Sequence, residues 1–332
     1  MTNSRETHST SADSRGFESV FESLNQTLMT GTYEIPAFEL DPISLPAIYV
    51  VGPPRSGTTL LGQLLAKHLN VGYINNLTAR FWMRPSIGIY LSRALDLDSY
   101  RAQIELKSYY GETRQPWGPH EFGHYWSHWF QLQESSPHNL ESKHLDSLEP
   151  LDFSLSLENE ILGPIGKPVV FKNIVCGFQA QYLANAHANS LFVFIERDPI
   201  DTGISLLNAR FHKFGSTSHW WSLRPKSLMN LPKDDVDQIA AQVLDSISEM
   251  KQELFPLGRK VISTDYRTLC ADPASVVNLI RQRVSELYAI EIPQLSMPEP
   301  TSPKSRDSFD DALVLRLAQS LKKYQAHLFK GD

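Results

Sequence analysis

A loop at residues 51–61, VGPPRSGTTLL, has the residue types and spacing to bind an anion. Gly52, Gly57 and Thr59 match the nucleotide-binding pattern G-x-x-x-x-G-K-[ST], but Thr58 stands where that pattern has lysine. The backbone N–H groups of such a loop, together with the positive end of the following helix dipole, cradle phosphate-like groups. The spacing therefore predicts an anion-binding loop.

The missing lysine indicates which phosphate chemistry is disfavoured. Enzymes that cleave between β- and γ-phosphates use that lysine with Mg²⁺ to stabilise the developing charge. Thr58 carries no charge, whereas the guanidinium of Arg55 in the same loop can bond two oxygens of one anion. The loop therefore favours a shorter anion, and an ATP-dependent kinase is the less favoured interpretation.

The residues around the loop predict the elements that hold it. Residues 47–51 form a β-branched run typical of a buried strand, and leucines recur at helical spacing over residues 60–69. The same criteria predict strands at 71–74, 168–172, 191–195 and 260–263, and helices at 177–188, 199–210, 236–254 and 273–288. This alternation predicts an α/β, three-layer P-loop-like fold with a central parallel sheet flanked by helices.

Ligands of parallel sheets bind at the carboxyl ends of the strands. The residues expected to converge at that edge are Arg55, Lys172, Arg197 and Tyr266, since each follows or ends a predicted strand. The sequence therefore predicts one crevice that contains three cations and an aromatic ring.

Length and composition are typical of a globular protein of 332 residues. We expect a disordered N-terminal segment at residues 1–16 and a single domain at 17–332, with a helical insertion at about 96–157 that is rich in aromatic residues and histidines. The net charge of −6 gives no general attraction for nucleic acid, so any anion site is local and no nucleic-acid partner is expected.

Cysteine usage and hydropathy bear on the compartment. Cys176 and Cys270 lie far apart without metal-ligand spacing, which favours free thiols in a reducing environment. The first residues lack the apolar core of a signal peptide, and no apolar run approaches the roughly 20 residues that span a bilayer. We therefore expect a cytoplasmic protein with no membrane span, whose oligomeric state the sequence leaves open.

Three motifs in this order resemble the sulfotransferase family that uses 3′-phosphoadenylyl sulfate (PAPS). The family pattern P-[RK]-S-G-T-T-[LW] is matched by Pro54, Arg55, Ser56, Gly57, Thr58, Thr59 and Leu60. A strand that ends in arginine, with a serine eight residues later, is matched by Arg197 and Ser205. A tyrosine-containing segment after a late strand is matched around Tyr266. The resemblance spans residues 47 to about 290.

The resemblance implies a fold, a donor and a reaction. It implies that the loop holds the 5′-phosphosulfate of PAPS without a metal, that Arg197 and Ser205 hold the 3′-phosphate, and that Tyr266 lies beside the adenine. It further implies a single sulfotransferase domain that moves a sulfuryl group to a hydroxyl, or an amine, of a small-molecule or glycan acceptor. Adenosine 3′,5′-bisphosphate would be released.

Sulfuryl transfer needs cations at the leaving group and a base at the acceptor. Arg55 and Lys172 are the predicted cations, although a strand-end lysine can also serve only as a solvated edge residue. The bases usual in the family are missing. Ile174 stands where many members have histidine, and residues 73–76 lack the glutamate of others.

The segment at residues 116–130 supplies a substitute base. Pro119 is expected in a first helical turn, which would place His120 and Glu121 at the positive end of that helix. We predict Glu121 as the base, with His120 and His124 as the next candidates. The alternative role of Glu121 is that of a helix cap.

The same segment also satisfies H-E-x-x-H at residues 120–124, which makes a zinc hydrolase an alternative. The extended metalloprotease pattern fails, because Ser127 and Phe130 replace its glycine and its third histidine. No metal ligand is therefore predicted. A further alternative is a protein that binds the nucleotide and catalyses no transfer.

The acceptor pocket is predicted to involve the helical insertion and residues 211–225. That stretch contains His219, Trp220, Trp221 and Arg224, and aromatic walls with a few polar groups suit an organic acceptor. The alternative role of the two tryptophans is to pack a lid against the domain.

Overall fold

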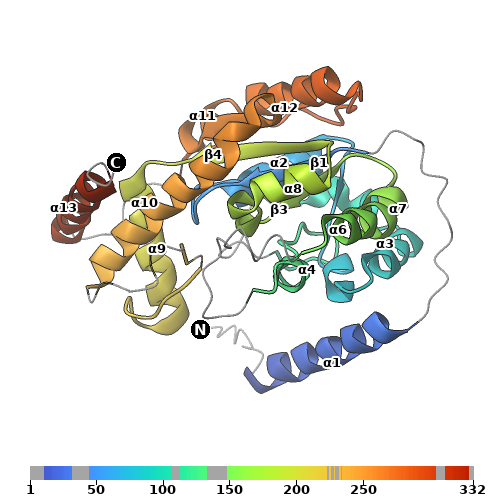
Figure 1. The fold of residues 1–332 in the computed structure, drawn as a ribbon, viewed down its shortest axis with the longest axis horizontal. Helices are drawn as coiled ribbons and strands as arrows, with labels where there is room; N and C mark the ends of the chain where they lie inside the picture. Colours follow the sequence, from blue (N-terminus) through green and yellow to red (C-terminus); the bar gives the residue numbers. More distant parts are fainter. Residues whose placement is uncertain are drawn as a thin grey trace, which may run out of the picture.

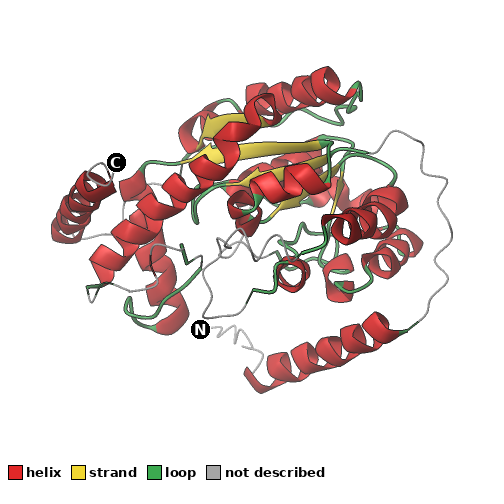
Figure 2. Ribbon diagram, in the orientation of Figure 1, coloured by secondary structure: helices red, strands yellow, loops and turns green. Residues whose placement is uncertain are grey.

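Five parallel strands form the centre of the computed structural model (Figures 1 and 2). The structure describes residues 11–31, 45–106, 113–132, 148–222, 224–225, 228, 232, 234–303 and 311–328. The strands are β1 (Ala47–Val51), β2 (Gly72–Tyr73), β3 (Val169–Lys172), β4 (Ser190–Glu196) and β5 (Val261–Asp265). Their spatial order is β2-β3-β1-β4-β5, so the predicted parallel sheet is confirmed.

The sheet is covered on both faces because its central strands are apolar at every position. All five residues of β1 are buried. Tyr49 faces an aromatic core, in which its ring stacks on Phe171 at 5.5 Å and on Phe192 at 5.0 Å. Ile48 and Val50 face a second, aliphatic core. The two cores confirm the predicted three-layer arrangement.

Different helices cover the two faces. The aliphatic core includes residues of α2 (Thr58–His68), α11 (Tyr266–Ala271) and α12 (Pro273–Tyr288). The aromatic core includes residues of α4 (Gly123–Trp129), α6 (Pro150–Leu157), α8 (Ala180–Ala186) and α10 (Asp235–Leu254). The remaining described α-helices are α1 (Ser11–Thr30), α3 (Pro85–Ala94), α7 (Gly163–Ile165), α9 (Pro199–Phe214) and α13 (Asp311–Leu328). Described 3-10 helices lie at Thr78–Phe81, Leu97–Gln103, Ile174–Phe178 and Phe255–Lys260, and a π-helix lies at Glu158–Leu162.

Helix α9 begins at the predicted position, with Asp198 as its N-cap. Asp198 accepts hydrogen bonds from the backbone N–H groups of Ile200 and Asp201, and Pro199 occupies the first helical position. These contacts satisfy donors that have no partner within the helix. The helix continues to Phe214, one turn beyond the expected end at Arg210.

Two helices at the ends of the chain were not predicted. Residues 11–16 form the first turns of α1 within the segment expected to be disordered, while residues 1–10 lie outside the described residues. Asn25 ties α1 to the domain, because its side chain donates to the Arg80 carbonyl at 2.8 Å and accepts from the Met83 N–H at 2.9 Å. Helix α13 buries Leu317 and Leu321 against α9 and α10.

The expected helical insertion is only partly described. Within 96–157 the described elements are the 3-10 helix at Leu97–Gln103, α4 and α6, whereas residues 107–112 and 133–147 lie outside the described residues. The expected helix start at Pro119 is wrong. Pro119 pairs with Asn75 in an isolated antiparallel bridge, and α4 begins only at Gly123. Residues 119–122 are therefore not helical.

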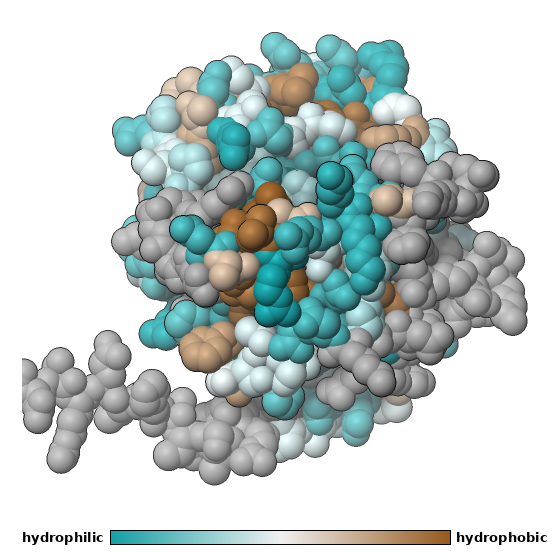
Figure 3. Space-filling model, turned by 90° about the vertical axis from the view of Figure 1, so that its left-hand side faces the viewer, coloured by the Kyte–Doolittle hydropathy of each residue, from teal (hydrophilic) through white to brown (hydrophobic). Residues whose placement is uncertain are grey.

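Two further findings bear on the expectations for thiols and membranes. Cys176 and Cys270 are free, as predicted, and both are buried. Among the described helices, none has the length and apolar character needed to cross a membrane. Figure 3 views the molecule from the side on which α9, α10 and α13 lie, and there apolar side chains gather in a recess bordered by polar ones.

Candidate active site

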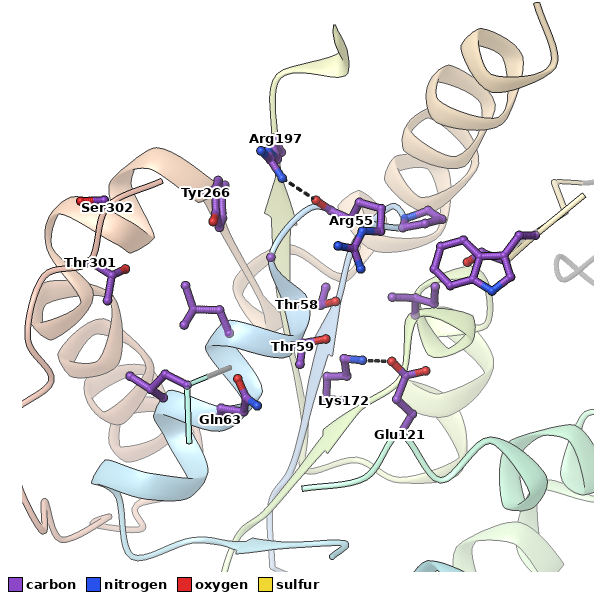
Figure 4. A pocket seen from close by; sticks show the side chains of 17 residues that line it. Arg55, Thr58, Thr59, Gln63, Glu121, Lys172, Arg197, Tyr266, Thr301 and Ser302 are labelled. Atoms are coloured by element: carbon purple, nitrogen blue, oxygen red, sulfur yellow. Dashed lines mark hydrogen bonds and ion pairs between the residues drawn. The ribbon is translucent and has the colours of Figure 1, made fainter. Parts of the chain in front are cut away.

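The carboxyl edge of the sheet opens onto a cavity of about 210 Å³ (Figure 4). Its walls include the loop after β1, the ends of β3 and β4, the start of α11 and part of the segment before α4. The predicted site residues that line it are Pro54, Arg55, Gly57, Thr58, Thr59, Leu60, Glu121, Lys172, Arg197 and Tyr266. The structure thus brings the loop, three cations and one carboxylate together from distant parts of the sequence.

Both glycines of the loop are required by close packing. Gly52 has φ of 155°, and a Cβ there would lie 2.4 Å from the Ile195 carbonyl oxygen. Gly57 has φ of 109°, and a Cβ there would lie 2.5 Å from the ring of Tyr266. Because both positions also have backbone angles that favour glycine, the loop can approach β4 and α11 closely. Helix α2 then begins at Thr58.

Ser56 lies inside this loop rather than on the cavity wall. Its side chain is fully buried, and its Oγ has no hydrogen-bond partner among the described residues. A buried hydroxyl of this kind is costly unless a ligand or water completes its hydrogen bonding.

Arg55 connects the loop to the two residues predicted for the 3′-phosphate. Its Nε donates to Ser205 Oγ on α9 at 3.0 Å, and its backbone carbonyl accepts from Arg197 Nη1 at 3.2 Å. The guanidinium of Arg197 lies 4.5 Å from the centre of the Tyr266 ring (Figure 4). Arg197 and Tyr266 line the cavity, but Ser205 does not, and its contact with a lining residue is the hydrogen bond from Arg55.

Lys172 and Glu121 form an ion pair at the end of β3 (Figure 4). The lysine side chain is 9% exposed, whereas that of the glutamate is 40% exposed. Burial, followed by the nearby charge of Arg55, lowers the pKa of Lys172 to about 7. The carboxylate of Glu121 acts in the opposite direction, since an opposite charge favours the protonated amine. A nearby anion therefore favours the charged form of Lys172.

His120 lies behind this pair. It lines a small cavity with Thr59, Gln63, Glu121 and Lys172, and not the main one. Its Nδ1 accepts a hydrogen bond from the Phe122 N–H at 2.8 Å, so Nε2 carries the proton of the neutral ring. Burial, with smaller effects of neighbouring cations, lowers the pKa of His120 to about 4. These features disfavour His120 as the base.

His124 lies away from the cavity. Its exposed ring stacks on Trp82 with ring centres 4.5 Å apart, and it does not line the cavity. Its predicted role as a reserve base is therefore not supported. The metal-binding helix implied by H-E-x-x-H is not formed, because only His124 of the two histidines is helical. No group of possible metal ligands occurs among the residues that the structure describes.

The acceptor side agrees with the prediction for residues 211–225 only in part. Trp221 and Ser222 line the cavity, whereas His219, Trp220 and Arg224 do not. Trp220 instead lies over the buried guanidinium of Arg210 at 4.8 Å, as a packing residue would.

Five further lining residues were not singled out from the sequence as site residues. They are Gln63, Leu106, Ile174, Thr301 and Ser302. Gln63 follows Thr59 by one helical turn, a spacing that would have revealed it. The backbone N–H of Thr301 donates to the Cys270 carbonyl at 2.8 Å, and this bond holds Thr301 beside the cavity. Because the bond joins distant segments, no local sequence pattern predicts it.

A model described as the sulfotransferase family matches residues 46–285. This chain belongs to the sulfotransferase family, and it is a transferase. The match covers the described strands, the loop and α11, and with them most of the residues that line the cavity. No curated protein sequence matches the chain significantly.

Solved structures of bacterial sulfotransferases are similar to this enzyme. STF1 of Mycobacterium tuberculosis H37Rv is 16% identical over 81% of this chain and 72% of its own, with a TM-score of 0.44. STF9 of Mycobacterium avium is 14% identical over 85% and 77%, with a TM-score of 0.46. A sulfotransferase of Alicyclobacillus acidocaldarius is 13% identical over 83% and 96%, with a TM-score of 0.39. The family assignment rests on the family match.

Proposed function

We propose that this sulfotransferase moves a sulfuryl group from PAPS to a hydroxyl, or an amine, of a small-molecule or glycan acceptor and releases adenosine 3′,5′-bisphosphate. The observation that carries the proposal is the composition of one cavity. It combines a glycine loop, two arginines and an ion pair between the buried Lys172 and the more exposed Glu121. These are the groups needed to bind a phosphosulfate, stabilise its leaving charge and remove a proton.

The loop and its neighbours fit the nucleotide donor. The N–H groups at the start of α2 suit the 5′-phosphosulfate, and the buried Ser56 hydroxyl has hydrogen-bonding capacity to complete. Arg197, which lies over the Tyr266 ring, suits a second phosphate next to a stacked base. The two cationic positions support a nucleotide with phosphate groups at both ends.

The transfer step uses three side chains of this cavity. Glu121 takes the proton from the acceptor oxygen while that oxygen forms its bond to sulfur. The bond between sulfur and the bridging phosphate oxygen breaks, and Arg55 and Lys172 stabilise the negative charge left on the bisphosphate. Atoms and charge balance, since SO₃ leaves the donor and the acceptor proton resides on Glu121.

The ion pair also suggests an order of events. Glu121 is the only acidic residue among the described lining residues, so it is the anion that neutralises Lys172 before a nucleotide binds. A donor phosphosulfate competes for the same ammonium and repels the carboxylate. Donor binding therefore releases Glu121 toward the acceptor, where it can act as a base.

Trp221 and Ile174 give part of the cavity wall an apolar character. We infer that the acceptor places an apolar or aromatic part against this wall and its nucleophile near Glu121.

A mass-spectrometric screen tests the proposal. The enzyme is incubated with PAPS and panels of phenols, alcohols, amines and oligosaccharides, and products are searched for added SO₃. The expected result is transfer to at least one panel, with loss of transfer and retained bisphosphate binding in Glu121→Gln. Tight bisphosphate binding without transfer to any acceptor would instead favour a nucleotide-binding protein that lacks catalysis.

A further inference from the structure

Glu121 lies in a short stretch without regular secondary structure, between the Asn75–Pro119 bridge and the start of α4 at Gly123. A catalytic side chain on such a stretch needs other contacts to fix its backbone, because no helix or strand does so. The surroundings of Glu121 show how this is achieved.

The residues on either side of Glu121 are tied to the sheet and to the core. The His120 N–H donates to the Ile74 carbonyl at 2.8 Å, just beyond β2. Phe122 adopts a left-handed conformation with φ of 59°, and its buried ring stacks on Tyr125 with centres 4.6 Å apart. A left-handed phenylalanine costs energy and persists only where the surroundings enforce it.

Asn173 holds Glu121 itself. Its Nδ2 donates to the Glu121 carbonyl oxygen at 2.9 Å, and its Oδ1 accepts from the Val175 N–H at 2.8 Å. The side chain is buried, and both contacts together fit only one orientation of the amide. Asn173 follows Lys172 directly in the chain. Two consecutive residues at the end of β3 therefore hold the carboxylate and the backbone of Glu121.

We propose that Asn173 is a positioning residue that fixes Glu121 for proton removal. This inference rests on the proposed function, because it takes Glu121 to be the base. The position requires an asparagine because its side chain makes two different hydrogen bonds. The amide oxygen must accept a hydrogen bond to cap the 3-10 helix at Ile174–Phe178, and the amide nitrogen must donate one to the Glu121 carbonyl oxygen. Aspartate would keep the cap but direct an oxygen at the Glu121 carbonyl oxygen.

The decisive variant is therefore Asn173→Asp, which changes almost no volume. We expect kcat for an acceptor from the screen to fall by about 10- to 100-fold, as for a misplaced catalytic group. Affinity for adenosine 3′,5′-bisphosphate is expected to change much less than kcat. Asn173→Ser, which keeps a capping oxygen and adds no charge, is expected to show the same loss. Asn278→Asp on α12 makes the same chemical change away from the cavity and is the matched control.

A double variant separates positioning from general stability. If Asn173 acts through Glu121, then Glu121→Gln combined with Asn173→Asp should be no slower than Glu121→Gln alone. If Asn173 only stabilised the fold, Asn173→Asp would lower kcat further in the double variant. Wild-type kcat in both Asn173 variants, or additive losses in the double variant, would overturn the proposal.

Crystal structures keep this test independent of the proposed function. In Asn173→Asp we expect the Glu121 carboxylate to have moved from Lys172, whether or not an acceptor is known. Absence of transfer by the wild-type enzyme would count against the proposed function alone. An unchanged Glu121–Lys172 pair in Asn173→Asp would contradict the positioning role.

Discussion

At the scale of single residues, the site depends on a balance of charge. Arg55, Lys172 and Arg197 line one cavity of a protein whose net charge is −6, and Glu121 is the only acidic residue among the described lining residues. The low pKa of Lys172, about 7, reflects its burial and the charge of Arg55. An anionic nucleotide would relieve this repulsion, so the cavity should bind phosphates more strongly than its surroundings.

Arg197→Ala should weaken binding of adenosine 3′,5′-bisphosphate at least about tenfold, since a hydrogen bond to a charged group contributes roughly 1.5–3 kcal/mol. Titration calorimetry measures the effect. The control is Arg259→Ala, which removes an exposed arginine whose side chain is 72% accessible and paired with Glu286. Equal affinities of the two variants would show that Arg197 holds no phosphate.

Lys172 should make nucleotide affinity pH-dependent. The bound phosphosulfate or phosphate favours the charged lysine, so its pKa rises on binding from the value of about 7 in the free enzyme. Above that value binding must take up a proton, and affinity should fall by up to about tenfold per pH unit toward pH 9. Below it the lysine is already charged and affinity should level off.

Calorimetry at several pH values measures this dependence, and Lys172→Met is the control. The variant should bind more weakly and lose the slope. His120 does not contribute in this range, because its pKa is about 4. The same slope in the wild type and in Lys172→Met would assign it to another group.

At the scale of elements, the loop depends on Gly52 and Gly57, which let it approach β4 and α11 closely. Gly57→Ala would place a Cβ 2.5 Å from the Tyr266 ring at a φ of 109°. We expect it to lower the free energy of unfolding by about 1–3 kcal/mol and to weaken bisphosphate binding. Denaturant titration and calorimetry measure the two effects.

Gly123→Ala is the matched control, since a Cβ there meets no described atom within 4 Å and the residue begins α4. Its stability should equal or exceed that of the wild type, because alanine favours helix by about 1 kcal/mol relative to glycine. If Gly57→Ala were as stable and bound as tightly as Gly123→Ala, the close packing of the loop would be unimportant.

The buried Arg210 packs against the segment that carries Trp220 and Trp221. Arg210 is fully buried, donates to Gln238 and Gln242 at 3.1 and 3.2 Å, and stacks on Trp220. Arg210→Met should lower the free energy of unfolding by at least about 1–3 kcal/mol, because it leaves buried oxygens unpaired. We also expect a raised acceptor KM, measured with an acceptor from the screen.

Arg316→Ala removes an exposed arginine that pairs with Asp234 on the neighbouring helix, and it should cost less than about 1 kcal/mol. An acceptor KM that stays at the wild-type value in Arg210→Met would show that the segment carrying Trp220 and Trp221 does not shape the acceptor wall.

The sequence predicted the elements whose signals are local. Four of the strand predictions and the glycine loop follow from short apolar runs and from residue spacing within about 10 positions, and β2 was found at a reduced length. The helix start at Pro119 was wrong because the backbone pairing of Asn75 with Pro119 joins distant segments and overrides the local preference. Helix α13 was not predicted, although its buried face packs on α9 and α10.

The site residues likewise divide into those with a local sequence signal and those brought in by contacts between distant segments. Arg55 was found from the loop motif, and Lys172 and Arg197 were found because each ends or directly follows a predicted strand. Glu121 was selected on the basis of a helix start at Pro119, whereas α4 begins only at Gly123, yet Glu121 lines the cavity and pairs with Lys172. Thr301 and Ser302 could not be found, since only the fold brings that segment to the cavity.

At the scale of the whole molecule, a single five-stranded sheet collects these residues at one edge. The family match over residues 46–285 covers every described strand and all the described residues that line the cavity except Thr301 and Ser302. The central claim is that this edge recognises a nucleotide through phosphates at both ends of its ribose.

Titration calorimetry with adenosine 3′,5′-bisphosphate and with adenosine 5′-phosphate tests that claim most directly, since the two ligands differ only in the 3′-phosphate. We predict that the bisphosphate binds at least about tenfold more tightly, because the 3′-phosphate adds a charged contact with Arg197. Equal affinities, or no binding of either nucleotide, would contradict the account.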